Sequence, residues 1–582
     1  MFVFGGKSWF YQCVAILASI CQSLPLRAPA LVPYSPFLSI WNAPTEQCLT
    51  HHKTSLNFRL FQLVGSPKKT ATNQAISMFY HDRLGYYPYI DEVTGESING
   101  GIPQFIPFTH HLRKAAADIR HYIPSEQQAG LAVIDWEEWR PSWVRNWASK
   151  TMYKKHSVQF VQLKNRSLTA QQAHSIARTE FEKASKTVMQ QTLILAEIVR
   201  PYKQWGFFLF PECYNYDYNQ NPNNYTGRCP DIEKQRNDEL WWLWRTSSAL
   251  YPSIYLESAL KSTPNAALYS RHRIQEAKRV STARSEHAPL PIYLYTRPVF
   301  TDDPLTFLTQ VDLVNTIGES AALGVSGVVM WGDLSFAKNV RTCRTLDKYM
   351  KHVLNPYIVN VTLAAKMCSQ VLCHGKGACT RKNWNANSYL HLNPQNFTIR
   401  KGRHRKISVI GHPTMADFLQ MAEEFECSCY SGNTDCHRKG RIQIPKSAII
   451  CISGDICIQA IPGFVPGSIL DNQFKGKTKL WPTKTSYVWW VTVRTPSSLV
   501  VCIFLCYGSG SSPAVMYSPR YVLFEVDVSI DVETNELGTG GWDVKPSRLI
   551  ESQVWMSRLS VLVNSRNLVM GKVDLEVSSG HP

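Results

Sequence analysis

The sequence predicts an α/β protein, a (β/α) barrel of the TIM type, with a small cysteine-rich module after it. Between about residues 55 and 350, short apolar runs alternate with long amphipathic segments, which indicates parallel strands joined by helices. A closed barrel is the commonest solution for a segment of this length. An open doubly wound sheet is the alternative, but the glycine fingerprint that would favour it is missing after the early strands.

The predicted elements follow from the spacing of apolar residues. The strands are expected at 75–79, 131–134, 206–210, 291–295 and 327–330. Helical patterns occupy 110–123 and 169–202, and in the second Phe181, Ala184 and Val188 roughly follow the 3.6-residue period. Residues 269–284 are rich in Arg and Lys and predict a basic helix, whose simplest interpretation is a solvated face.

Cysteines crowd into the segment that follows the predicted barrel. They are Cys368, Cys373, Cys379, Cys427, Cys429 and Cys436, in a region expected to be poor in helix. In the cytosol such a group would suggest zinc, whereas in a secreted chain a disulfide-stapled module is favoured. The sequence therefore predicts disulfides here, with no metal and no cofactor.

The N-terminus indicates that the protein is exported. Residues 1–23 contain one Lys and an apolar run from about Trp9 to Ile20, the pattern of a secretory signal peptide. Removing Cys13 and Cys21 with it leaves fourteen of the sixteen cysteines, an even number. Four glycosylation sequons agree with this route, and they begin at Asn165, Asn224, Asn360 and Asn396.

Charge and the C-terminal segment narrow the classes of partner. Lys and Arg outnumber Asp and Glu by 62 to 44, which favours a polyanionic partner, yet no basic arm of the kind that binds nucleic acid is present. The apolar run at 497–508 is shorter than the roughly 20 residues that span a bilayer. No hydrophobic anchor signal ends the chain, so soluble secretion is expected, and residues 439–582 form an extension without an assigned function.

The segment "GLAVIDWEEWRP" (130–141) carries the candidate chemistry. Strand side chains alternate, so Asp135 and Glu137 share a face while Trp136 and Glu138 point the other way. Two such close acids cannot both ionise easily, and a proton held beside a carboxylate is what cleavage of a glycosidic bond requires. The alternative is an acidic strand end that caps the next helix or pairs with Arg140.

Aromatic residues at other strand ends favour the catalytic interpretation. Tyr80, Tyr255 and Trp331 follow or end apolar runs, and the carboxyl ends of parallel strands meet at one edge. Taken singly, each of these residues is more simply interpreted as a core residue. Together they predict an aromatic-walled cleft suited to sugar rings.

Longer motifs resemble the hyaluronidases of animal venoms, lysosomes and sperm, most of all the sperm-surface type. They include "GLAVIDWEEWRPSW", "MFYHDRLGYYPYID", "FPECYNYDY", "ALYPSIYLES" and "LNPYIVNVTLAAKMCSQVLC", and the resemblance covers about residues 30–460. It implies a distorted (β/α) barrel at 30–362 and an EGF-like module at 363–438. It also implies retaining hydrolysis of β-1,4 N-acetylglucosaminyl bonds in hyaluronan.

The resemblance also implies roles for individual residues. Glu137 would be the general acid and later the base, while the acetamido oxygen of the substrate acts as nucleophile. Asp135 and Tyr255 would orient that acetamide, and Tyr80, Arg140 and Trp331 would contact substrate. The implied disulfides are Cys48–Cys343, Cys213–Cys229, Cys368–Cys379, Cys373–Cys427 and Cys429–Cys436.

Two departures from the family pattern leave alternatives open. Phe208 stands where the family usually has tyrosine, and "PEC" (211–213) replaces Pro-Asp-Cys. Losing one hydrogen bond to a neutral partner costs about 0.5–1.5 kcal/mol, which predicts weakened turnover. A carbohydrate-binding or adhesion protein on the same scaffold is therefore a second hypothesis, with contact to a cell surface or egg coat. A third is cleavage of chondroitin, against which Tyr255 argues; a monomer is expected in each case.

Overall fold

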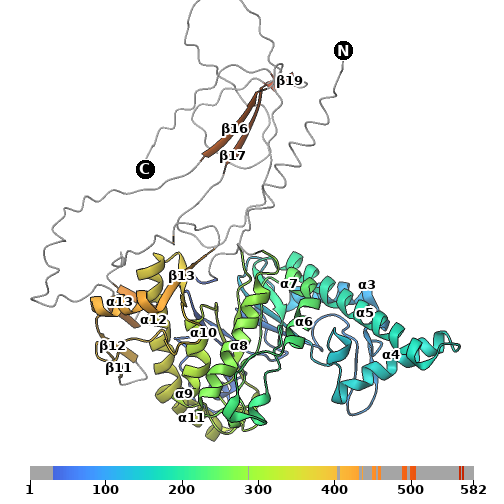
Figure 1. Ribbon diagram of the computed structural model, residues 1–582, viewed down its shortest axis with the longest axis horizontal. Coiled ribbons are helices and arrows are strands. Elements are labelled where there is room, and N and C mark those ends of the chain that lie inside the picture. Colours follow the sequence, from blue (N-terminus) through green and yellow to red (C-terminus); the bar gives the residue numbers. More distant parts are fainter. Residues whose placement is uncertain are drawn as a thin grey trace, which may run out of the picture. The chain divides into compact units, whose positions relative to one another are not determined.

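A computed structural model describes residues 31–285, 288–402, 407–430, 436, 449–453 and 456–459, together with short strands beyond residue 487 (Figure 1). The chain divides into two compact units, residues 1–466 and 467–582. The expected signal peptide, 1–23, lies outside the described residues.

Parallel strands form the centre of the first unit. One sheet has the order β2-β1-β9-β8 and another the order β3-β6-β7, and every pairing within them is parallel. Isolated parallel bridges from Phe208 to Tyr251 and from Leu250 to Ile292 connect β7 to β8 through the intervening segment. The two sheets also approach each other at their other edges, β2 and β3. A Cβ added at Gly65 of β2 would lie 2.6 Å from the carbonyl oxygen of Ile76 in β3. The strands are β1 Leu38–Asn42, β2 Leu63–Gly65, β3 Ile76–Tyr80, β6 Gly130–Asp135, β7 Lys203–Phe207, β8 Tyr293–Thr296 and β9 Gly327–Trp331.

Helices follow most of these strands along the chain. They are α2 Glu46–Thr50, α3 Phe108–Tyr122, α4 Thr151–Lys164, α5 Ala170–Val199, α6 Asp231–Glu239, α7 Trp241–Thr246, α8 Pro264–Ser281, α9 Gln310–Leu313, α10 Glu319–Ala322, α11 Val340–Tyr349 and α12 Asn355–Cys373. One apolar cluster holds alternate side chains of the strands, such as Ile40, Met78, Val133 and Val329. The other strand face packs with the helices in a larger cluster. The predicted α/β architecture is confirmed.

The predicted elements differ from the observed ones at identifiable places. The strand expected at 206–210 is wrong: β7 ends at Phe207, and Leu209 has a positive φ of 71° that an extended strand does not allow. Strands β1 and β2 were not predicted. The basic helix is present as α8. The expectation that its charged residues form a solvated face is wrong, because Arg271 and Arg273 are buried. Arg271 is buried because it pairs with Glu319 (Nη2 to Oε1, 2.7 Å).

The cysteine-rich region is continuous with the body of the first unit. Helix α12 runs through the expected boundary at 362 and carries both Cys368 and Cys373. Figure 1 shows α12 near α13 and the small strands beyond it. These later elements are β10 Gly377–Arg381, β11 Phe397–Lys401, β12 Ile407–Gly411, α13 Met415–Glu424, β13 Phe425–Cys429, β14 Ile449–Ser453 and β15 Ile456–Gln459, and two short strands, β4 Tyr89–Ile90 and β5 Ser97–Ile98, lie earlier.

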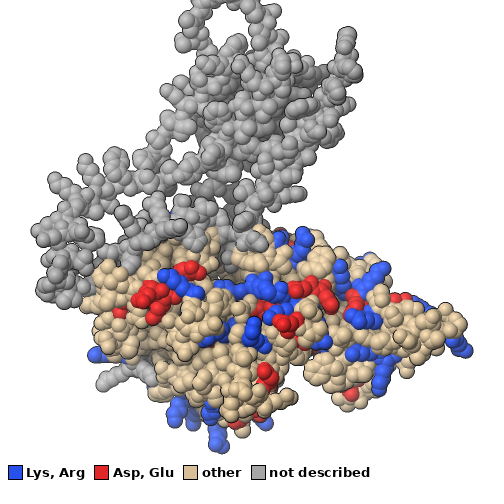
Figure 2. Space-filling view, in the orientation of Figure 1, with Lys and Arg blue, Asp and Glu red and all other residues tan. Residues whose placement is uncertain are grey.

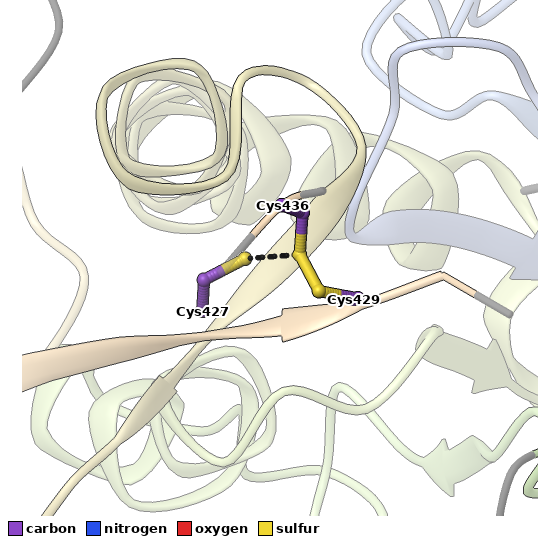
Figure 3. A group of neighbouring side chains, drawn as sticks. All are labelled: Cys427, Cys429 and Cys436. Atoms are coloured by element: carbon purple, nitrogen blue, oxygen red, sulfur yellow. Dashed lines mark hydrogen bonds between the residues drawn. A yellow bond between two sulfur atoms is a disulfide. The ribbon is translucent and has the colours of Figure 1, made fainter. Parts of the chain in front are cut away.

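Six disulfides lie among the described residues. Five of them are the pairs that the family resemblance implies: Cys48–Cys343, Cys213–Cys229, Cys368–Cys379, Cys373–Cys427 and Cys429–Cys436. The sixth joins Cys451 and Cys457. Figure 3 shows Cys427 beside the Cys429–Cys436 bond. Zinc requires free thiolates, and all three of these sulfurs are in disulfides, so the cluster is a disulfide cluster.

The second unit contains two pairs of antiparallel strands among its described residues. They are β16 Val488–Arg494 with β17 Leu499–Leu505, and β18 Val563–Asn564 with β19 Asn567–Leu568. Strand β17 accounts for most of the apolar run at 497–508. Within the described part of the chain, no helix has both the length and the apolar character that crossing a bilayer demands.

The surface charge of the first unit is mixed in sign on the face that Figure 2 shows. Lys and Arg side chains there lie among Asp and Glu side chains, and basic groups also gather at the lower margin where Figure 1 places α11. The exposed cations of that helix are Arg341, Arg344 and Lys348.

Candidate active site

The candidate residues meet at the carboxyl edge of the parallel strands. Tyr80 ends β3 and Asp135 ends β6, and the two are direct partners in the strand pairing. Phe208 follows β7, and its backbone N–H donates to the carbonyl of Ile134 (2.9 Å). Trp331 ends β9. Parallel pairing therefore gathers on one edge residues that lie up to 251 positions apart in the sequence.

Asp135 is the buried member of the acid pair. The residue is 7% exposed, and its Oδ1 accepts no hydrogen bond from the described residues. Burial, and after it the charge of Glu137, raise the pKa of Asp135 well above its ordinary value. Asp135 therefore holds a proton under conditions in which an exposed carboxyl has lost it.

Glu137 is the accessible member of the pair, with a side chain that is 48% exposed. It lies two residues beyond β6, and Arg140 approaches it from two directions: Nη2 lies 3.4 Å from Oε1, and Nη1 donates to the backbone carbonyl (3.0 Å). Lys150 Nζ donates to the same carbonyl. The pairing with Arg140 that the alternative interpretation expected is thus present, together with the acid pair.

Trp136 and Glu138 lie beyond the end of β6, where strand alternation no longer applies, and each has a partner outside the acid pair. Burial alone would raise the pKa of Glu138, but the hydrogen bond from His81 lowers it, and the two groups lie 2.6 Å apart. That same bond raises the pKa of His81. Trp136 stacks on Tyr87 with ring centroids 4.5 Å apart. Glu138 therefore forms an ion pair with His81.

Aromatic rings surround the acids. Trp331 donates from Nε1 to the Tyr80 hydroxyl (3.1 Å), and its ring stacks on Tyr255 with centroids 6.4 Å apart. Burial, and after it the charge of Asp135, raise the pKa of both Tyr80 and Tyr255. Both phenols consequently remain protonated and able to donate hydrogen bonds near Asp135. Phe208 packs in the inner layer, 4.8 Å from the ring of Tyr295.

Two charged residues at the site had no role predicted from the sequence. Arg297 follows β8, lies 5.1 Å above the Trp331 ring and pairs with Asp333 (2.9 Å). Its position at a strand end was the available signal. Glu212 accepts from Arg140 Nε (3.3 Å), and its only signal was the departure of "PEC" from the family pattern.

The four sequons lie in different surroundings. Asn165 and Asn224 are exposed. Asn360 lies on α12, where its Oδ1 accepts from the backbone N–H of Leu392 (2.6 Å). The amide of Asn396 donates to Asp417 Oδ2 (2.7 Å).

A parallel α/β scaffold with a buried carboxyl, an accessible carboxyl and stacked aromatic rings at its strand ends is of the kind that carbohydrate-cleaving hydrolases use. Comparison with known proteins identifies the family. A family model described as hyaluronidase, glycoside hydrolase family 56, matches residues 26–440. The chain belongs to the hyaluronidase family of glycosidases.

Curated relatives support this assignment. Hyaluronidase-5 of Mus musculus is 50% identical over 448 residues, which are 77% of this chain and 84% of that protein. Hyaluronidase PH-20 of Homo sapiens is 49% identical over 76% of this chain and 86% of its own length. Among solved structures, bee venom hyaluronidase in complex with a hyaluronic acid tetramer is 28% identical, covers 55% of this chain and 98% of its own, and superposes with a TM-score of 0.48.

Proposed function

We propose that the protein is a secreted endo-β-N-acetylhexosaminidase that cleaves the β-1,4 bonds of hyaluronan with retention of configuration. The observation that carries this proposal is the pairing of a buried, proton-holding Asp135 with an accessible Glu137 at the end of one strand. Membership of the hyaluronidase family supports the substrate class, because its relatives are named as hyaluronidases.

In the proposed reaction Glu137 donates its proton to the glycosidic oxygen as the bond to the anomeric carbon breaks. The acetamido oxygen of the same sugar attacks that carbon and closes a five-membered ring, so the protein supplies no carboxylate nucleophile. Asp135 and Tyr255 orient the acetamide and stabilise the positive charge that it acquires. Glu137 then removes a proton from the water molecule that opens the ring, which restores both the enzyme and the original configuration.

Substrate contacts are proposed for the groups around the acids. The rings of Tyr80 and Trp331 would stack on sugar faces, and Phe208 would contribute an apolar surface. The guanidinium of Arg297, above Trp331, is suited to a glucuronate carboxylate. Chondroitin presents the same carboxylate and acetamide, so it remains a second substrate candidate, against which the presence of Tyr255 argues by family resemblance.

The finer architecture belongs to the same proposal. We expect the parallel strands of residues 30–362 to close into a distorted (β/α) barrel and residues 363–438 to form an EGF-like module. Export would remove residues 1–23, and glycans would occupy sequons. Most of the extension, 439–582, lies outside the described residues.

A binding or adhesion protein on this scaffold is the competing function, and Phe208 is the observation that favours it. A substrate-gel assay distinguishes the two. Wild type and Glu126→Gln are expected to clear hyaluronan, and Glu137→Gln is expected to lose clearing by at least 100-fold, since a general acid contributes about 10²–10⁴. Glu126 is a matched control because it is exposed and precedes the amino end of β6.

If no variant clears the gel while all three retain hyaluronan on an affinity column, the adhesion function is correct. NMR of the first-formed reducing end tests the stereochemistry. Retention predicts the β-anomer at early times, and an initial α-anomer would contradict the acetamido mechanism.

A further inference from the structure

Arg140 is shared between two carboxylates, only one of which belongs to the acid pair. Its Nη2 lies 3.4 Å from Glu137 Oε1, and its Nε lies 3.3 Å from Glu212 Oε1. The Arg140 and Glu212 side chains are 8% and 11% exposed, so solvent screens this contact weakly. Burial alone would lower the pKa of Arg140, but Glu212, and after it Glu137, raise it. Glu212 is thus the stronger of the two charge partners of Arg140.

A second arginine faces the other oxygen of Glu212. Arg145 Nη1 lies 3.0 Å from Glu212 Oε2, and Arg145 also pairs with the buried Glu233. The Arg145 guanidinium lies 4.1 Å above the Tyr214 ring, whose hydroxyl donates to Glu212 Oε1 (3.4 Å). Within the part of the chain that the structure describes, Glu212 is therefore the one carboxylate that contacts both Arg140 and Arg145.

The backbone holds Glu212 in this position. Asn237 Nδ2 donates to its carbonyl oxygen (2.8 Å), and the next residue, Cys213, is bonded to Cys229. Three residues earlier, Leu209 has a positive φ of 71°, so the chain turns sharply between Phe208 and Glu212. This loop brings a side chain from beyond β7 to the arginine that follows β6.

Several other charged and titratable groups lie near Glu137. Asp135 and Glu138 are the neighbouring carboxyls, Arg140 and Lys150 the neighbouring cations, and Tyr80 and Tyr255 the neighbouring phenols. Of these groups only Arg140 contacts Glu212. Any influence of Glu212 on Glu137 therefore passes through Arg140 and through the charge of Glu212 itself.

We propose that Glu212 is a positioning residue that takes up part of the charge of Arg140, so that Glu137 keeps the proton it must donate. This inference rests on the proposed function. If Glu212 were neutral, Arg140 and Arg145 would lose the carboxylate that they share. Arg140 would then interact more strongly with Glu137. A carboxylate beside an uncompensated guanidinium releases its proton more readily. A general acid that has already lost its proton cannot protonate the leaving oxygen.

The test is the pH–rate profile of Glu212→Gln. Its alkaline limb is expected to move to lower pH by roughly one unit, the size of pKa shift that one nearby charge typically causes. The effect should fall on kcat, with KM within about twofold, because Glu212 does not contact substrate. Glu212→Asp keeps the charge and should restore the wild-type limb.

Glu233→Gln is the matched control, because it removes one buried charge from Arg145 without contacting Arg140. It should lower the melting temperature about as much as Glu212→Gln, but the limb should move much less, because Glu233 reaches Arg140 only indirectly, through Arg145 and Glu212. Arg145→Gln makes the opposite prediction: Glu212 is then free to bind Arg140 alone, and the limb should move to higher pH. This variant decides the matter if Glu212→Gln does not fold.

The outcomes separate the two levels of the proposal. An active wild type whose limb is unmoved in Glu212→Gln, or moved equally in Glu233→Gln, overturns the role of Glu212 and leaves the proposed function standing. A wild type without hydrolytic activity at any pH overturns both.

Discussion

At the scale of single residues, Phe208 is the position where this chain is expected to lose rate. The ring is 9% exposed and lies 6.1 Å from the ring of Tyr255, so it is part of the inner layer of the site. A phenyl ring packs there but donates no hydrogen bond. The cost of one missing bond to a neutral partner is about 0.5–1.5 kcal/mol, up to roughly tenfold in rate or affinity.

Phe208→Tyr is therefore expected to raise kcat/KM by up to about tenfold. Steady-state cleavage of hyaluronan measures it. Phe105→Tyr adds the same hydroxyl at a residue that is 46% exposed and should change nothing. If the two variants behave alike, Phe208 does not face the substrate.

The role proposed for Asp135 would come at the expense of stability. Its pKa is higher in the folded protein than in the unfolded chain, so the folded state binds the proton more tightly. The stability that this gives is fully present below the unfolded pKa of about 3.9 and is lost as the pH rises toward the folded value. At neutral pH the buried carboxyl thus costs stability.

Asp135→Asn is expected to stabilise the fold at pH 7.5 by about 1 kcal/mol or more, the scale of an unsatisfied buried polar group, while it abolishes activity. At pH 4 the gain should shrink, because the native side chain is then protonated. Melting curves at the two pH values measure this difference. Equal gains at both would show that Asp135 is not the proton-holding acid.

At the scale of elements, the sequence was most informative where one periodicity acts alone. The regular apolar pattern of α5 and the buried run of β6 each predicted an element close to its observed bounds. The apolar run also indicated that Asp135 ends this strand, but strand alternation does not extend to Glu137, which lies two residues beyond β6. Strand β1 was missed because Ser39 and Asn42 interrupt its apolar run, and β2 was missed because it has only three residues.

Elements whose limits depend on distant residues were harder to predict. The apolar letters of Phe208 and Phe210 continue the β7 pattern, but the backbone leaves the strand at Leu209. The charges of α8 suggest a solvated face, yet Arg271 is buried because Glu319, 48 residues later, neutralises it. Glu212 likewise gains its meaning only through Arg140, 72 residues earlier. Such pairings are set by tertiary structure and leave no periodic signal.

At the scale of the whole molecule, one buried carboxylate joins the parallel-strand body to the cysteine-rich region. Glu319 on α10 is completely buried and receives Arg271 from α8 at 2.7 Å. Arg381, the last residue of β10, reaches the other oxygen at 2.7 Å, and the Tyr389 hydroxyl donates to Oε1 at 3.0 Å. Two buried guanidiniums therefore depend on a single negative charge, across elements that are far apart in the chain.

Removing that charge should loosen both regions together. Glu319→Gln leaves two buried cations uncompensated, and breaking a buried ion pair from one side typically costs about 3–5 kcal/mol. Chemical denaturation should show this loss as one shifted transition. Glu180→Gln removes one partner of a solvent-exposed pair with Lys164 (3.7 Å) and should cost no more than about 1 kcal/mol. If the Glu319 variant instead unfolds in two steps, with the strand body at its wild-type midpoint, the carboxylate serves the cysteine-rich region alone and does not couple the two.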